Sequence, residues 1–167
     1  MFQEIKTTEL KENPFDLIGK QWLLVTAGKE DGSCNTMTAS WGGVGVMWGK
    51  DVAFVVIRPQ RYTKEFIDAA ATLSLSVLPG SYRKTYNYLG TVSGRNKDKI
   101  AVSGLTVVHD GSTPYFEEAD TVLLCRKLFA QPFQPDAFLS EEIKEKWYPE
   151  QDYHTLYICE IEKVLKK

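Results

Sequence analysis

Short segments rich in β-branched and aromatic residues recur along the chain, and this feature most constrains its fold. Residues 72–78 read TLSLSVL, an almost perfect alternation of polar and apolar side chains. A period of two is typical of a β-strand, because successive side chains of a strand point to opposite faces of the sheet. We therefore expect this strand to bury its leucines in a core and to place its serines against something polar.

Six further segments have strand composition and are bounded by Gly, Asp, Asn or Pro. They are residues 20–27, 35–41, 51–58, 105–109, 121–130 and 153–164. The alternation in the last segment is imperfect, which predicts a β-bulge or a change of register near Cys159. The glycine-rich segment 42–49 predicts a connection between strands rather than a nucleotide-binding loop, because a strand follows it where such a loop needs a helix.

Helix signals are fewer. Residues 63–71 begin with a potential N-cap, Thr63, and carry apolar side chains on one stripe. Residues 81–89 predict a short helix that ends at Gly90, and residues 140–147 begin with Ser-Glu-Glu and carry lysines late, as the helix dipole favours. Seven strands with a few peripheral helices predict a mainly β protein, a β-barrel with helical decoration in a single domain over residues 1–167.

Composition narrows the class of protein. With 43% hydrophobic and 25% charged residues, the chain can fold around a core rather than remain disordered. Its formal net charge of −2 gives no electrostatic case for a nucleic-acid partner. No apolar run approaches the roughly 20 residues that span a bilayer, and the N-terminal segment lacks the apolar core of a secretion signal. We expect a cytoplasmic protein with no membrane partner.

The three cysteines, Cys34, Cys125 and Cys159, lie far apart in the sequence, and the chain has only two histidines. There is no CxxC pair, and a tetrahedral zinc site would need ligands from across the whole chain. We expect three reduced, mostly buried thiols and no metal site.

Residues 58–64, RPQRYTK, are the first candidate for ligand binding. Arg58 and Arg61 follow an apolar strand, and Thr63 begins a predicted helix. Free N–H groups at a helix N-terminus bind anions, and an arginine can bind a phosphate through two parallel hydrogen bonds. The segment therefore fits an anion site, and it equally fits a solvated turn whose arginines pair with surface acids.

Two other segments are candidates for ligand contacts. The strand NTMTASW at 35–41 alternates small hydroxyl residues with apolar ones. It could present amides and hydroxyls to the polar rim of a planar heterocycle while Met37 or Trp41 covers a face. The polar loop at 90–99 carries three basic residues. A weakly polar outer face for the strand, and a solvated connection for the loop, are the plainer interpretations.

Taken together and in this order, these segments resemble the flavin reductase-like family of FMN-binding split barrels, including its flavoredoxin-type branch. The resemblance extends from about residue 13 to residue 164. It rests on NTMTASW at 35–41, RPQRYTKEFI at 58–67, SGRNKDK at 93–99, SGLT at 103–106, YFEEA at 115–119 and YHTLYICEIEKV at 153–164. It implies a closed Greek-key split β-barrel, a homodimer, and FMN bound near the subunit interface.

The resemblance also implies a role for each matching position. The strand at 37–41 would line the isoalloxazine ring, and residues 58–64 would surround the ribityl chain and phosphate. Ser93, Gly94 and Lys99 would lie near the flavin or the nicotinamide entrance. The cofactor-binding residues that follow from it are Asn35, Met37, Thr38, Ala39, Ser40, Trp41, Arg58, Gln60, Arg61, Tyr62, Thr63, Lys64, Ser93, Gly94 and Lys99.

The function that the resemblance implies is an NAD(P)H-dependent flavin reductase, in which hydride passes from nicotinamide C4 to flavin N5 and the cofactors supply the chemistry. No side chain stands out as a general acid or base. We expect the aromatic region around Trp147 and Tyr148 to bound the open face of the site, and His154 to form a structural hydrogen bond beside it. The alternatives are a flavoredoxin-like electron carrier that receives electrons from a redox partner protein, and a barrel without flavin that serves as a binding module.

Overall fold

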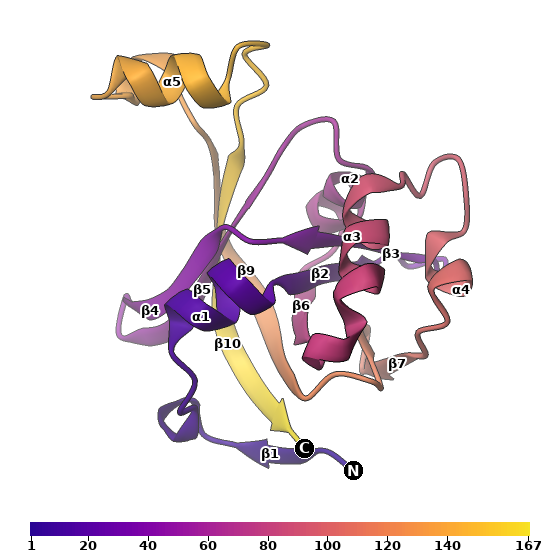
Figure 1. Cartoon of the computed structure of the whole chain (residues 1–167). Coiled ribbons are helices and arrows are strands. Elements are labelled where there is room, and N and C mark those ends of the chain that lie inside the picture. Colours follow the sequence, from indigo (N-terminus) through magenta and orange to yellow (C-terminus); the bar gives the residue numbers. More distant parts are fainter.

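The computed structural model describes residues 1–167 and is built on one large antiparallel sheet (Figure 1). Its hydrogen-bonded order is β3-β2-β6-β9-β10-β5-β4, with β1 paired to β10, and β7 and β8 form a separate hairpin. The strands are β1 Gln3–Ile5, β2 Leu23–Gly28, β3 Cys34–Ala39, β4 Gly42–Met47, β5 Lys50–Ile57, β6 Thr72–Val77, β7 Val107–Asp110, β8 Thr113–Phe116, β9 Thr121–Pro132 and β10 Thr155–Lys166. The helices are α1 Pro14–Asp16, α2 Tyr62–Ala69, α3 Arg83–Thr91, α4 Lys99–Ser103 and α5 Glu141–Trp147.

The mainly β architecture is confirmed, but the hydrogen-bonded ladder does not close into a barrel. Strands β3 and β4 stand at the two ends of the order, so each is an edge strand. They are joined only by Ser40 and Trp41, yet β3 pairs with β2 and β4 pairs with β5. Side chains complete what the ladder leaves open: Met37 and Ala39 of β3 lie in the main core cluster, and Val44 of β4 packs against it.

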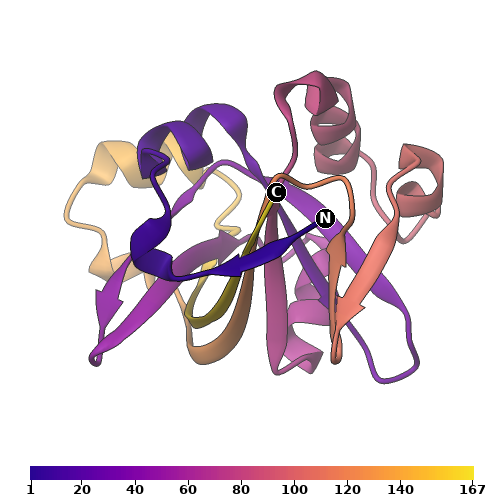
Figure 2. The same ribbon diagram turned by 90° about the horizontal axis from the view of Figure 1, so that it is seen from below.

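The core has two parts, which lie on opposite faces of β6. Leu73, Leu75 and Val77 belong to the main cluster inside the curved sheet. A second cluster packs α3, α4 and the β7–β8 hairpin against the outer face, and α3 and α4 lie together on that side (Figures 1 and 2). The predicted polar contact of the serine face is present at Ser74, whose hydroxyl donates to the carbonyl oxygen of Pro114 in β8 at 2.6 Å, but the Ser76 hydroxyl is buried without a hydrogen-bond partner.

The glycine-rich segment 42–49 was predicted to be a connection, and this prediction is wrong, because Gly42–Met47 forms strand β4. Glycine has a low intrinsic preference for strands, but here the segment pairs with β5 over its whole length, from Gly42↔Val55 to Met47↔Lys50. A Cβ at Gly43 or Gly45 would lie 3.6 or 3.7 Å from the ring of Phe54 on β5, so these positions face that ring. The tertiary contact therefore decides the structure of this segment.

Two predicted helix boundaries also differ. The helix predicted from Thr63 begins at Tyr62, with Arg61 as N-cap, and Thr63 is buried within its first turn. The helix predicted to end at Gly90 continues to Thr91. Gly90 instead packs closely on β3, where a Cβ would lie 3.2 Å from the Cβ of Thr38, which is tighter than most Cβ contacts.

The predicted register change near Cys159 and the predicted helix over residues 140–147 are confirmed. The register of β10 against β9 shifts between Ile158 and Cys159, as the broken alternation indicates, and again between Ile161 and Lys163. Helix α5 begins after Ser140, whose hydroxyl accepts from the Ile143 N–H. All three cysteines are free thiols. No helix of the structure is both long and apolar enough to cross a membrane.

Residues 133–154, here called the arm, connect the far ends of β9 and β10 and include α5. Figure 1 shows α5 standing away from α2, α3 and α4, beyond the end of the sheet. The two strands that carry the arm are twelve residues each, and their pairing extends from Thr155↔Pro132 to Lys166↔Thr121. The arm is therefore attached to the most extensively paired strands of the molecule.

Gly42 supports a first prediction. A Cβ at this position would lie 2.3 Å from the Phe54 carbonyl oxygen, and its φ of 150° is one that side chains disfavour. We expect Gly42→Ala to lower the free energy of unfolding by about 2–4 kcal/mol, measured by urea denaturation. Gly45→Ala is the matched control, since its Cβ would meet the Phe54 ring at an ordinary 3.7 Å; an equal loss in both variants would contradict the steric argument.

Candidate functional site

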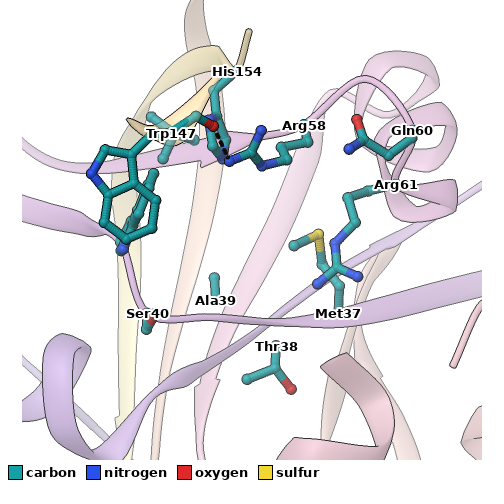
Figure 3. A pocket seen from close by; sticks show the side chains of 11 residues that line it. Met37, Thr38, Ala39, Ser40, Arg58, Gln60, Arg61, Trp147 and His154 are labelled. Atoms are coloured by element: carbon teal, nitrogen blue, oxygen red, sulfur yellow. Dashed lines mark hydrogen bonds between the residues drawn. The ribbon is translucent and has the colours of Figure 1, made fainter. Parts of the chain in front are cut away.

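The main candidate site is an open pocket of about 540 Å³ between β3, the end of β5 and the arm (Figure 3). This volume is in the range that holds small-molecule ligands. Eight of the fifteen predicted residues line it, together with three that were not on that list. The lining residues are Met37, Thr38, Ala39, Ser40, Trp41, Val56, Arg58, Gln60, Arg61, Trp147 and His154.

One wall of the pocket is the end of strand β3. Because β3 is an edge strand, the alternate N–H and C=O groups on its outer side have no strand partner and are available to a ligand. Met37 and Ala39 are buried in the core behind this wall. The Thr38 hydroxyl donates to the Tyr86 carbonyl oxygen at 2.5 Å, which ties β3 to α3. The wall is thus a fixed polar edge with apolar support.

Arg58 and Gln60 line the pocket, but their polar groups contact the arm. Arg58 Nη1 lies 2.6 Å from Asp152 Oδ2, and Gln60 Nε2 donates to the same oxygen at 2.7 Å. Arg58 Nη2 donates to the Trp147 carbonyl oxygen at 2.9 Å, and the guanidinium lies over the ring of Tyr148. The hydrogen bonds from Gln60 and then Arg58 hold the pKa of Asp152 below its ordinary value. We call Asp152, Arg58 and Gln60 the Asp152 network.

Arg61 and Lys99 are different, because they have no acidic partner. Ion pairs in the structure involve other lysines and arginines. Arg61 Nη1 donates to the Gly90 carbonyl oxygen at 2.7 Å, and Lys99 Nζ donates to the Leu89 carbonyl oxygen at 2.8 Å. Figure 3 shows the Arg61 guanidinium pointing toward β3, while Arg58 points toward Trp147 and His154.

The surroundings of Arg61 and Lys99 destabilise the charged forms of both side chains. Lys99 is only 3% exposed. Burial, and then the charge of Arg61, lower the pKa of Lys99 to about 8. Burial, and then the charge of Arg58, also lower the pKa of Arg61. Two neighbouring cations without a carboxylate constitute an electrostatic deficit that a bound anion would relieve.

The remaining predicted residues lie around a neighbouring pocket at the start of α2. Asn35, Tyr62, Gly94 and Lys99 line it. Asn35 Nδ2 donates to the Thr63 hydroxyl at 2.9 Å, so the Thr63 side chain holds β3 to α2 instead of capping the helix. Three members line neither pocket: besides Thr63, Lys64 pairs with Asp68 at 2.6 Å, and the Ser93 hydroxyl accepts from the Arg95 N–H.

The arm supplies the aromatic side of the main pocket. Trp147 packs edge to face on Trp41 with ring centroids 4.9 Å apart, and both indoles remain about two-fifths exposed at 42% and 38%. The ring centroid of His154 lies 5.2 Å from that of Trp41, and the His154 Nδ1 is 2.7 Å from the Tyr148 hydroxyl oxygen. The predicted structural hydrogen bond of His154 is therefore present, and the same residue also lines the pocket.

Sequence reasoning missed Asp152 and Val56. Val56 is one of several apolar residues of β5, and no feature of its pattern marks it as part of a pocket. Asp152 follows a helix in a polar segment, where an acid is ordinary. Its importance depends on a contact with Arg58, which precedes it by 94 residues.

Comparison with known proteins defines the class. Residues 15–166 match the family model described as the flavin reductase like domain, so the chain belongs to this family. No curated protein matches the chain. The fold is that of several solved structures of low sequence identity, which are flavin-binding proteins by their names.

Three of these structures show the range of the family. The FMN-binding domain of a flavin reductases-like enzyme from Shewanella baltica is 14% identical with a TM-score of 0.70, over 99% of this chain and 77% of that one. Flavoredoxin from Methanosarcina acetivorans is 20% identical with a TM-score of 0.71, over 98% and 76%. A Streptomyces globisporus NADH:FAD oxidoreductase in complex with NAD and FAD fragments is 17% identical with a TM-score of 0.65, over 88% and 74%.

His154 supports a prediction about acid stability. Burial, and then the charge of Arg58, lower the pKa of His154 to about 4, whereas an unfolded histidine titrates near pH 6.5. Between these values the unfolded chain binds the extra proton, so stability is complete above about pH 6.5 and falls toward pH 4 by on the order of 3 kcal/mol. Urea denaturation at pH 7 and pH 4.5 should show this loss, and His154→Gln should reduce it.

His109 provides the control for that measurement. It is the other histidine of the chain and is exposed on β7. His109→Gln should keep the wild-type dependence of unfolding free energy on pH. If His154→Gln also kept the full acid loss, the buried imidazole would not be its source.

Proposed function

We propose that the chain binds FMN in the pocket between β3, β5 and the arm, and acts as an NAD(P)H-dependent flavin reductase. The single observation that carries the proposal is the pair Arg61 and Lys99, two cations without an acidic partner beside a pocket bounded by an edge strand and two indoles. FMN combines the matching parts, since it has a phosphate, a polyol chain and a planar heterocycle with a polar rim.

The phosphate fits the cationic end of the site. At neutral pH a phosphate monoester carries close to two negative charges, and charge-assisted hydrogen bonds from arginine and lysine are among the strongest in proteins. Helix α2 begins immediately after Arg61, so the N–H groups of Tyr62 and Thr63, which donate to no backbone carbonyl, add to the positive potential. Arg61 and Lys99 would bind the phosphate, while Arg58 stays hydrogen-bonded to Asp152 and Trp147 of the arm.

The planar ring fits the opposite end. The outer edge of β3 offers backbone donors and acceptors to the rim of an isoalloxazine, and Trp41 at its end offers aromatic surface. FMN itself would supply the redox chemistry, accepting hydride from a reduced nicotinamide. The chain would orient the two rings, exclude water with its indoles, and stabilise negative charge on the pyrimidine side through backbone N–H groups of β3.

The alternative is a flavoredoxin-like electron carrier with no NAD(P)H activity. It shares the FMN site and differs only in the source of electrons, which would be a redox partner protein. A barrel without flavin is disfavoured by Arg61 and Lys99, because two desolvated cations with no counter-charge are unfavourable unless an anion is bound.

A homodimer and a cytoplasmic location stay predictions. Exposed apolar side chains such as Val46 and Trp48, on and beside edge strand β4, are compatible with a partner subunit.

The phosphate assignment predicts selectivity between flavins. The change is Arg61→Ala, which removes one charge-assisted contact worth roughly 1.5–3 kcal/mol. We expect the dissociation constant for FMN to rise by about 10- to 100-fold, while the constant for riboflavin, which has no phosphate, changes little. Fluorescence titration of the flavin-free protein with each ligand measures both.

Arg126→Ala is the control for a lost guanidinium. Arg126 pairs with Glu160 and Glu162 on the sheet surface and does not line the pocket. It should leave both dissociation constants unchanged. Equal weakening of FMN and riboflavin by Arg61→Ala would show that the residue supports the pocket and does not bind phosphate.

Reduction by nicotinamide separates the two candidate functions. With FMN bound and oxygen excluded, excess NADH or NADPH should remove the visible absorption band of the oxidised flavin in stopped-flow measurements. A flavin that stays oxidised for minutes with both nucleotides, yet is reduced by dithionite, would contradict the reductase and favour the electron carrier. Protein that binds no flavin at all would contradict both.

A further inference from the structure

Asp152 joins the arm to the site more directly than any other residue. Its carboxylate accepts from Arg58 at 2.6 Å and from Gln60 at 2.7 Å, and both donors belong to the turn between β5 and α2. The same Arg58 donates its second nitrogen to the Trp147 carbonyl oxygen at 2.9 Å. One carboxylate therefore fixes the guanidinium that fixes the backbone of Trp147.

The Trp147 indole has little else to hold it. It is 42% exposed, its only aromatic contacts within the chain are the edge-to-face packing on Trp41 and a cation–π contact with neighbouring Lys146, and its ring N–H makes no hydrogen bond. Figure 3 shows it on the side of the pocket away from Arg61. An exposed aromatic ring keeps a defined position only when its backbone is held. Trp147 is the last residue of α5, and the hydrogen bond from Arg58 ties this end of the helix to the turn between β5 and α2, so the placement of this wall relative to the rest of the pocket depends on it.

The arm as a whole has separate support. Tyr148 is 5% exposed and contacts His154 through its hydroxyl at 2.7 Å. The Phe133 N–H donates to the His154 carbonyl oxygen at 2.8 Å, and Phe138 packs on Tyr148 with ring centroids 5.4 Å apart. These contacts do not involve Asp152. Removing its carboxylate should therefore leave the arm folded and loosen the position of the Trp147 indole.

We propose that Asp152 is a positioning residue for the second substrate: through Arg58 it holds the Trp147 indole as the wall against which a planar nicotinamide ring is placed. This inference rests on the proposed function, because it assigns the nicotinamide-contacting surface of the same site. Asp152 touches neither ring in this arrangement. Its effect is on the placement of the substrate and not on retention of FMN, which Arg61 and Lys99 hold from the other end.

The test is a double-mutant cycle of Asp152→Ala and Trp147→Ala in the FMN-bound protein. Each single variant should raise KM for NADH by about tenfold, with kcat and the FMN dissociation constant changed less than about twofold. In the Trp147→Ala background, Asp152→Ala should add less than about twofold, because the residue acts through an indole that is already gone. Asp152→Asn keeps an oxygen acceptor and should fall between Asp152→Ala and the wild type.

Asp110→Asn is the matched control, since Asp110 forms a comparable ion pair with Lys163 at 2.8 Å and does not line the pocket. It should leave KM unchanged. The proposal is wrong if Asp152→Ala weakens FMN as much as it raises KM, or if its effect on KM is undiminished in the Trp147→Ala background. Either result would mean that freed Arg58, and not the indole, transmits the change.

A measurement without flavin or nucleotide keeps this proposal separate from the proposed function. The near-ultraviolet circular dichroism of the flavin-free protein reports fixed aromatic packing. Asp152→Ala should lose the same component of the spectrum that Trp147→Ala loses, with unchanged far-ultraviolet signal. If the protein proves not to react with NADH, the circular dichroism measurement still decides whether Asp152 positions Trp147. An unaltered spectrum in Asp152→Ala would overturn the inference.

Discussion

The antiparallel pairing of β9 with β10 holds the two parts of the sheet together. On one side of this pair, β9 is followed in the hydrogen-bonded order by β6, β2 and the edge strand β3. On the other side, β10 is followed by β5 and the edge strand β4. Both strands extend over twelve residues, and their shared bulges near Cys159 and Glu162 let them bend without losing the pairing. Because the arm connects these two strands at one end, their pairing also determines where Trp147 and His154 can lie.

The candidate site divides its cations between two tasks. Arg58 has a carboxylate partner, and its guanidinium is used to hold the arm. Arg61 and Lys99 have only the carbonyl groups at the end of α3, where the negative end of the helix dipole tolerates positive charge. A helix C-terminus can stabilise cations without neutralising them. The site therefore keeps a positive potential that a bound anion would relieve.

The sequence predicted much of this from local patterns. The alternation in residues 72–78 led to β6, the broken alternation near Cys159 led to a real register shift, and the segments at 35–41 and 58–61 meet in one pocket. It failed where a residue's role is set by a distant neighbour. The glycines of β4 are strand residues because they pair with β5, and Thr63 is a hydrogen-bond partner of Asn35 and not an N-cap.

What the sequence by itself determined is the set of elements and the kinds of side chain available to a ligand. Periodicity and turn residues specify strands and helices because these depend on neighbours within a few positions. Only the tertiary structure decided which arginine is free. Arg58 and Arg61 are three residues apart and were equivalent candidates for a phosphate. The fold brings Asp152 to Arg58 and brings only carbonyl oxygens to Arg61, and a charge is available to a ligand only where folding has not already paired it.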